Sequence, residues 1–342
     1  MKTLPARPKG GPAAVVLATV GLAALVLSLA LLPAAAGPAQ ASPERWQAAW
    51  PDTDFSKSAV AFDEILSGGP PKDGIPSIDD PRFVSVAEAG ELSPSEPVIG
   101  LEVAGDARAY PLRILTWHEI VNDTVGGTPV AVTYCPLCNA AIVFDRRVGG
   151  AATTFGTTGL LRHSDLVMYD RATESWWQQF LGEAIVGERT GERLALVPAR
   201  LESWANFAAR FPEGRVLVPN DPNLRPYGAN PYVGYDSAAF PFLYKGGLPD
   251  GIAPMARVIA VGDEAWSLDL LRRQGRIESG DLVLTWTAGQ ASALDSERLA
   301  DGKDVGNVVV QRRDPDGLSD VPYDVTFAFV FHAFRPQGEI RQ

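Results

Sequence analysis

The chain has 342 residues, of which 46% are hydrophobic and 21% charged, and its formal net charge is −11. This composition supports one large hydrophobic core or two moderate ones and confines disorder to short stretches. The acidic balance excludes nucleic acid and anionic membrane surfaces as electrostatic partners.

Residues 1–41 carry the pattern of an export signal. Three basic residues within the first nine precede an apolar run at residues 13–32, and the small residues Ala39-Gln40-Ala41 follow it. This order predicts cleavage after Ala41. The apolar run also approaches the roughly 20 residues that span a bilayer, so an uncleaved membrane tether is the alternative. Both interpretations predict an exported protein, either periplasmic or extracellular, or anchored to the outer face of the cytoplasmic membrane.

The next part of the chain changes from an extended arm to regular strands. Residues 42–96 are rich in proline and glycine, which predicts an extended arm with one helical patch near residues 59–66. Apolar and polar residues then alternate over residues 98–110 around a turn at Gly105-Asp106, which predicts a β-hairpin. This hairpin begins a predicted β-rich domain at residues 97–218.

Cys135 and Cys138 are the only cysteines of the chain and stand in the stretch Thr-Tyr-Cys-Pro-Leu-Cys-Asn. Two sulfurs at this spacing can chelate a soft metal, exchange electrons as a dithiol, or close a small structural disulfide ring. Predicted strands at residues 129–134 and 141–145 flank them, and a strand, tight turn and strand resemble a metal knuckle. A helix after the cysteines, as in thioredoxin-like proteins, is the alternative.

His118 is the predicted third ligand, on a short helix that Pro111 opens. Imidazole binds zinc and copper well, and Glu119 beside it is a candidate to orient the imidazole or to carry a proton. A core histidine hydrogen-bonded beneath the sheet is the alternative interpretation. Two cysteines and one histidine would leave an open position on zinc, whereas copper(I) accepts fewer ligands. Further oxygen ligands, or else turn and cap residues, are Asp123, Asp165 and Asp170.

A weak internal repeat appears when residues 98–145 are laid over residues 258–295. The second copy has Thr287-Ala288-Gly289-Gln290 at the place of the cysteine turn, so it keeps the scaffold and lacks the sulfurs. Chance similarity between β-hairpins is the alternative. The predicted fold is therefore α+β and mainly β, with a hairpin-rich body in which residues 257–342 form a second, degenerate β-rich domain.

Residues 219–256 form a long linker, which predicts a lid or binding rim. A strand pair at residues 175–185 and a short helix near residues 203–211 precede it. The linker's aromatic residues either line a groove for a sugar or lipid or pack the loop onto the body; they are Tyr227, Tyr232, Tyr235, Phe240 and Phe242.

Several motifs resemble one family of exported prokaryotic proteins, the domain-of-unknown-function family 3179. The resemblance covers residues 55–335 and implies no activity, because none is established for the family. His163 and His332 depart from its usual Asn and Trp, which makes them poor candidates for a shared site. The motifs are Gly-Ile-Pro-Ser-Ile-Asp-Asp-Pro-Arg-Phe (74–83), Trp-His-Glu-Ile-Val-Asn-Asp (117–123), Tyr-Cys-Pro-Leu-Cys (134–138), Ser-Asp-Leu-Val-Met-Tyr-Asp-Arg (164–171) and Trp-Gln-Gln (177–179).

Three function classes follow from these observations. The leading prediction is a copper or zinc site formed by Cys135, Cys138 and His118, for metal handling or a metal-assisted reaction. The second is an extracytoplasmic thiol–disulfide oxidoreductase that uses the two cysteines on a thiol partner protein. The third is a noncatalytic envelope-binding module. The sequence does not decide whether the protein is an enzyme.

Overall fold

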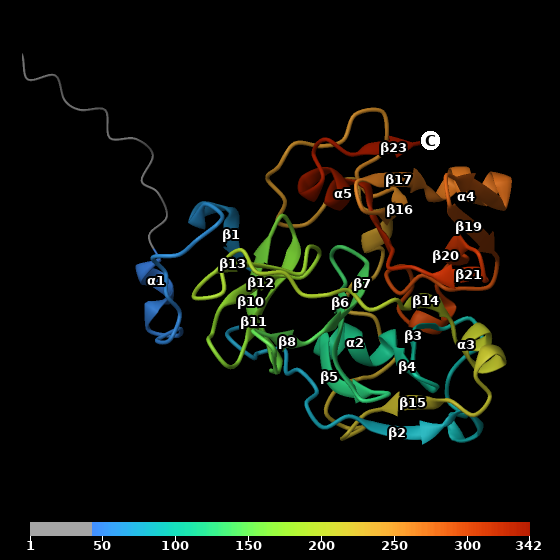
Figure 1. Ribbon diagram of the computed structural model, residues 1–342, viewed down its shortest axis with the longest axis horizontal. Helices are drawn as coiled ribbons and strands as arrows, with labels where there is room; N and C mark the ends of the chain where they lie inside the picture. The colour runs from blue at the N-terminus through green and yellow to red at the C-terminus, as the bar shows by residue number, and fades with distance from the viewer. Residues whose placement is uncertain (1–42) are drawn as a thin grey trace, which may run out of the picture. The chain divides into compact units, whose positions relative to one another are not determined.

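The computed structural model describes residues 43–342, which belong to one compact unit that begins at Gln40. The predicted signal or anchor at residues 1–41 lies outside the described residues. Strands make up 40% and helices 15%, so the prediction of a mainly β protein is confirmed. Five small, mostly antiparallel sheets follow one another in a propeller-like ring (Figure 1). Among the described helices, none is long and apolar enough to cross a membrane.

The cysteines belong to a three-stranded antiparallel sheet, here called the cysteine sheet. Gly126 and Gly127 form its first turn with φ of 53° and 82°, the geometry of a tight two-residue hairpin. A Cβ at Gly126 would lie 2.1 Å from the carbonyl oxygen of Val103, so only glycine fits there. The strands, in spatial order, are β5 (Ile120–Val125), β6 (Thr128–Cys135) and β7 (Ala140–Asp145).

The hairpin predicted at residues 98–110 is confirmed as β3 and β4, which turn at Ala104 and Gly105. The helix predicted after Pro111 is also confirmed and buries Leu112 and Leu115. This hairpin lies in the middle of a five-stranded sheet. The sheet and its helices contain, in spatial order, β14 (Arg200–Ser203), β3 (Pro97–Val103), β4 (Asp106–Pro111), β15 (Arg215–Val218) and β2 (Arg82–Ser85), with α2 (Leu112–His118), α3 (Trp204–Arg210) and η2 (Val86–Glu88).

A second five-stranded sheet, the tryptophan sheet, holds the start of the arm. The helical patch predicted at residues 59–66 is wrong in part: a short 3₁₀ turn is followed by β1, which pairs along the edge of β10. Hydrogen bonds from that edge override the local helix preference. The elements are α1 (Glu44–Gln47), η1 (Phe62–Glu64), β1 (Ile65–Ser67), β10 (Phe155–Arg162), β11 (Asp165–Asp170), β12 (Trp176–Gln178) and β13 (Glu183–Val186).

Trp176 is the residue through which the arm packs on the tryptophan sheet. Its fully buried ring meets Trp46, Trp50 and Phe55 edge-on, at centroid distances of 5.1, 5.3 and 5.4 Å. We expect Trp176→Ala to lower the free energy of unfolding by about 3–5 kcal/mol, because it leaves a large cavity. Urea denaturation measures this loss, and the exposed Phe240 provides a control whose alanine variant should change it by less than about 0.5 kcal/mol. Equal effects would contradict the packing argument.

One of the two C-terminal sheets has a strand arrangement already seen earlier in the chain. The hairpin β16–β17 has antiparallel β22 on one side and parallel β23 on the other, as β3–β4 has antiparallel β14 and parallel β15. The elements are β22 (Asp324–Phe327), β16 (Arg257–Val261), β17 (Glu264–Ser267), β23 (Glu339–Arg341), β18 (Arg276–Ser279), β19 (Leu282–Thr287), β20 (Asn307–Asp314), β21 (Gly317–Asp320), α4 (Leu268–Gln274) and α5 (Ala328–Phe334).

Strand β22 holds the cysteine turn in place from the C-terminal part of the chain. The Thr326 hydroxyl donates to the carbonyl oxygen of Cys138 at 2.8 Å, and the Asn139 amide donates to the carbonyl oxygen of Val325 at 2.7 Å. Two distant segments therefore meet at the cysteines. The remaining described elements are β8 (Arg147–Val148), β9 (Ala151–Ala152), η3 (Tyr235–Ser237) and η4 (Leu299–Asp301).

Candidate functional site

The cysteines lie in the tight turn between β6 and β7, so the predicted strand, turn and strand are confirmed. The turn is closed by backbone hydrogen bonds from Cys138 to Cys135 at 3.2 Å and from Asn139 to Pro136 at 3.1 Å. Asn139 has a φ of 52°, a conformation that asparagine tolerates well. Both thiols are free and buried. This geometry differs from a thioredoxin-like motif, in which a helix follows the cysteines.

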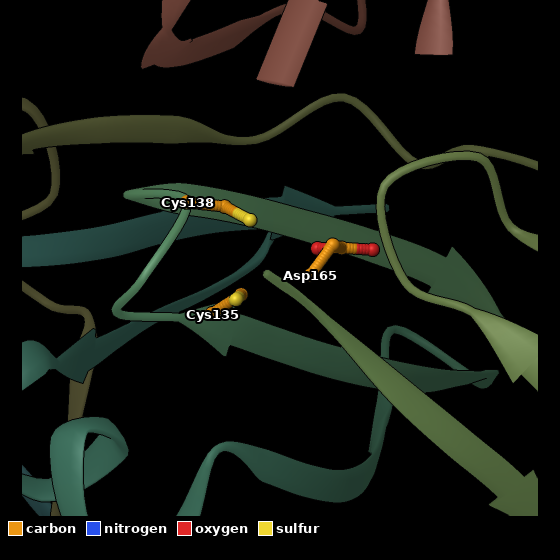
Figure 2. Close-up of side chains that lie close together, drawn as sticks. All are labelled: Cys135, Cys138 and Asp165. Atoms are coloured by element: carbon orange, nitrogen blue, oxygen red, sulfur yellow. The ribbon is translucent and has the colours of Figure 1, made fainter. Parts of the chain in front are cut away.

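Asp165 is the third member of the site and comes from the neighbouring hairpin β10–β11 (Figure 2). One ligand atom from each of Cys135, Cys138 and Asp165 lies within 4.8 Å of the others. The hairpin turns at His163 and Ser164, which both have positive φ, of 53° and 64°. Non-glycine residues enter this conformation at a cost, which the surrounding contacts must offset. The turn directs the Ser164 carbonyl to both thiols, at 3.7 Å from Cys135 Sγ and 3.5 Å from Cys138 Sγ.

The Asp165 carboxylate is fully buried, and N–H groups of residues 43–342 donate hydrogen bonds to only one of its two oxygens. Its Oδ2 accepts hydrogen bonds from the Gln178 amide at 2.5 Å and the Phe180 backbone at 2.9 Å. Its Oδ1 has no N–H or O–H donor among the described residues and lies beside the two thiols, whose weak S–H hydrogen bonds to the carboxylate oppose the rise of its pKa on burial. A buried acceptor that only weak S–H donors reach costs free energy, which a cation bound to it would recover.

Burial raises the pKa of each acidic group around the sulfurs. It raises the pKa of both cysteine thiols and raises the pKa of Asp165 to about 6. Burial, with the charge of Asp165, also raises the pKa of Glu119 and of Asp324 to about 8 each. No ion pair of these three carboxyl groups occurs among the described residues. The site is thus a buried group of acids without a protein counter-charge.

The structure does not bring His118 into this group. Its ring lies between the carbonyl oxygen of Pro76, 2.7 Å from Nδ1, and the hydroxyl of Tyr227, 2.8 Å from Nε2. Asp165 therefore stands beside the sulfurs where His118 was predicted. Glu119, in contrast, lies close enough to the site for its charge to add to the effect of burial and raise the pKa of Cys135.

The other two predicted aspartates have structural partners. Asp123 accepts hydrogen bonds from Arg108 and Tyr110, each at 2.6 Å. Asp170 accepts from the Trp177 indole at 2.9 Å and also caps the turn that follows it. Asp170 is thus a turn residue, as the alternative interpretation has it, whereas Asp123 lies within β5 and forms an ion pair with Arg108 of β4.

Part of the long linker packs against the core around the cysteines. Tyr232, Tyr235 and Tyr244 pack against the hydrophobic cluster that contains both cysteines. The Ser164 hydroxyl donates to the carbonyl oxygen of Phe242, and the Phe242 backbone donates to the Tyr235 hydroxyl at 3.2 Å. The same serine thus binds the thiols through its carbonyl and the covering loop through its hydroxyl.

We expect Ser164→Ala to loosen the segment at residues 238–248 while the rest of the fold keeps its stability. Loss of one hydrogen bond worth about 1 kcal/mol would speed backbone amide exchange there about fivefold. Hydrogen–deuterium exchange with mass spectrometry measures this rate. Ser319→Ala, at an exposed serine of β21, is the control and should leave the segment unchanged. An unchanged rate in Ser164→Ala would show that other contacts hold the loop.

Comparison with known proteins gives a family but no described relative. A family model described as "Protein of unknown function (DUF3179)" matches residues 72–338. No curated protein and no solved structure matches the chain.

Proposed function

The chain belongs to the DUF3179 family of proteins of unknown function, and we propose that it binds a soft transition metal, zinc or copper, through Cys135, Cys138 and Asp165. The observation that carries the proposal is the buried Asp165 carboxylate, one oxygen of which has no donor among the described residues other than the two free thiols beside it. Thiolate sulfur binds both metals, and a carboxylate oxygen is a common zinc ligand. Three protein ligands leave one position open, which suits metal handling or a metal-assisted reaction.

Charge also favours a bound cation. Two thiolates and one carboxylate would place three negative charges in a buried space, and Glu119 and Asp324 lie close enough to influence their ionisation. A divalent ion neutralises more of this charge than a monovalent one, so zinc is favoured over copper(I).

Elemental analysis tests the proposal. The full chain is purified under reducing conditions from the compartment in which it matures, and zinc and copper are measured per protein by mass spectrometry. We expect close to one metal atom per chain. Protein without metal that also fails to bind added zinc or copper would overturn the proposal. If the cysteines were also found oxidised in a second sample, alkylated before any reductant is added, with two protons and two electrons lost to a partner disulfide, the thiol–disulfide alternative would replace it.

Metal affinity is expected to rise steeply with pH. Burial raises the pKa of both thiols, so each must lose its proton when the metal binds. Two displaced protons give up to about a 100-fold gain in affinity per pH unit, below the thiol pKa values. Competition with a zinc-sensitive dye between pH 6 and 8 measures this slope. A pH-independent affinity would mean that the thiols are not the ligands.

We also propose that the chain is exported, on the strength of the basic head, the apolar run at residues 13–32 and Ala39-Gln40-Ala41. Mass measurement of the mature N-terminus tests this: cleavage after Ala41 or retention of the anchor supports export. A cytoplasmic protein with an intact first residue would contradict it.

A degenerate duplication is the third proposal, and equal strand order supports it. The hairpin β3–β4, α2 and β5–β6–β7 have counterparts in β16–β17, α4 and β18–β19–β20, in the same chain order. In the second copy, residues 288–306 replace the tight cysteine turn. Superposition of the two halves tests this, and diverging strand paths would contradict it. If the copies are related, the metal chemistry belongs to the first alone.

A further inference from the structure

The backbone carbonyl of Ser164 is a buried acceptor without a strong donor. Ser164 is fully buried and lies in the turn between β10 and β11, outside the ladder of strand hydrogen bonds. Among residues 43–342, only the thiols of Cys135 and Cys138 donate to its carbonyl oxygen, at 3.7 and 3.5 Å. A thiol is a weak donor, and buried carbonyl groups are normally paired with stronger ones. When both thiols lose their protons, as metal binding requires, this oxygen keeps no donor, and a cation beside it would take the place of the lost protons.

The distances from this oxygen to the two sulfurs agree with tetrahedral zinc coordination. Zinc binds sulfur at about 2.3 Å and oxygen at about 2.0–2.2 Å, so tetrahedral angles place a sulfur ligand and an oxygen ligand about 3.5–3.7 Å apart. The Ser164 carbonyl oxygen already has this separation from both sulfurs. A carboxylate oxygen of Asp165 lies within 4.8 Å of the same sulfurs (Figure 2). Two consecutive residues of one hairpin thus offer two oxygens to the pair of cysteines.

We propose that the Ser164 carbonyl oxygen is the fourth ligand of the metal, and that the segment at residues 238–248 holds it in place. The inference rests on the proposed metal site and completes its coordination. Two thiolates, one carboxylate and one carbonyl fill the position that the three side chains leave open, so the metal carries no water. A closed site favours metal handling over a metal-assisted reaction. Two oxygen ligands also suit zinc better than copper(I), which prefers soft sulfur.

The Ser164 side chain connects this ligand to the segment at residues 238–248. Its hydroxyl donates to the carbonyl oxygen of Phe242, and the backbone N–H of Phe242 donates to the Tyr235 hydroxyl at 3.2 Å. The positive φ of Ser164, 64°, is a conformation that surrounding contacts must maintain. A neutral carbonyl also binds zinc more weakly than a thiolate or a carboxylate. Movement of the segment would therefore displace this ligand first and begin the release of the metal.

Spectroscopy of the full chain loaded with cobalt(II) in place of zinc tests the fourth ligand. The electron paramagnetic resonance signal of cobalt is recorded in ordinary water and in water enriched in the magnetic isotope of oxygen. We expect a tetrahedral visible spectrum and no broadening of the signal by the enriched water. Broadening would show that water occupies the fourth position, and it would overturn the Ser164 ligand while leaving the proposed metal site intact. A chain that takes up neither cobalt nor zinc nor copper would instead overturn the proposed function itself.

The rate of zinc release tests the role of the segment. The zinc-loaded chain is mixed with a zinc-sensitive dye, at dye concentrations where the rate no longer depends on the dye. Ser164→Ala removes the hydrogen bond to Phe242 and keeps the backbone carbonyl. We therefore expect unchanged stoichiometry and release about fivefold faster, the effect of losing one hydrogen bond. Tyr235→Phe removes the other hydrogen bond of Phe242 and should also speed release.

Ser319→Ala is the matched control for the release experiment. It also removes a hydrogen bond of a serine hydroxyl, to Asp314 at 2.7 Å, but at an exposed position outside the site. Equal release rates in Ser164→Ala and Ser319→Ala would overturn the role of the segment. Unfolding midpoints measured on the same samples show whether a variant acts through the fold. If Ser164→Ala is unstable, Tyr235→Phe carries the test, and a release rate equal to that of Ser319→Ala has the same meaning.

Discussion

Replacing Cys138 by serine is expected to abolish stoichiometric metal binding, from close to one metal atom per chain to less than about a tenth. The hydroxyl of serine is far less acidic than a thiol, so the variant offers only one soft ligand, Cys135, beside Asp165. The substitution is nearly isosteric in a buried turn, so the fold should persist. Elemental analysis with circular dichroism measures binding and folding on one sample.

Two further variants sharpen this test. Asp165→Asn keeps the hydrogen bonds of one oxygen but removes the anionic ligand, and we expect it to lower zinc affinity by at least about 10–100-fold. Asp145→Asn, at the other end of β7, is the matched control and should bind normally. If Cys138→Ser kept full stoichiometry, the metal would have to lie elsewhere. A mixed disulfide trapped through Cys135 in that variant would instead support thiol exchange.

Local sequence patterns predicted those elements whose partners are near in the chain. Alternation over residues 98–110 predicted the β3–β4 hairpin, and Pro111 marked the start of α2. The strands on both sides of the cysteines could be predicted because β6 and β7, which are consecutive in the sequence, hydrogen-bond to each other. The helix expected near residues 59–66 failed because its residues pair with β10, almost 100 positions away.

The site itself depends on contacts that no local pattern encodes. Asp165 reaches the cysteines because of the left-handed turn at His163 and Ser164. Neither residue is a glycine, so the sequence gives no sign of this turn. Asp324 reaches the same region through β22, 186 residues after Cys138. The two cysteines could therefore be predicted, but only the fold selects Asp165 among the aspartates of the chain.

His118 and Glu119 illustrate why adjacent residues can serve different places. Both lie at the end of α2, where Glu119 takes a φ of 58° and ends the helix. The change of backbone direction leaves the imidazole with Pro76 and Tyr227, while the carboxyl group lies near enough to the sulfurs for its charge to raise the pKa of Cys135. Sequence proximity to a metal motif is thus weak support for ligation.

Asp324 is a further buried carboxyl group near the cysteines: its Oδ1 accepts from the Ala141 backbone at 3.3 Å, and its Oδ2 has no hydrogen-bond partner within residues 43–342. Burial raises the pKa of Asp324 from 3.8 to about 8. Between these values the folded metal-free protein holds a proton that the unfolded chain has lost, so the stability that this group contributes falls as pH rises. Burial gives Glu119 the same trend, with a pKa of about 8.

We therefore expect Asp324→Asn to flatten the pH dependence of unfolding in metal-free protein. One fewer bound proton reduces the slope by up to about 1.4 kcal/mol per pH unit between pH 4.5 and 7.5. The variant should be less stable than the wild type, or equal to it, near pH 4.5 and more stable near pH 8. Urea denaturation across this range measures the slope, and Asp316→Asn, at an exposed carboxylate, is the control. Parallel curves for Asp324→Asn and the wild type would mean that Asp324 ionises normally in the folded protein. Asp324 would then not belong to the buried acids with a raised pKa around the cysteines.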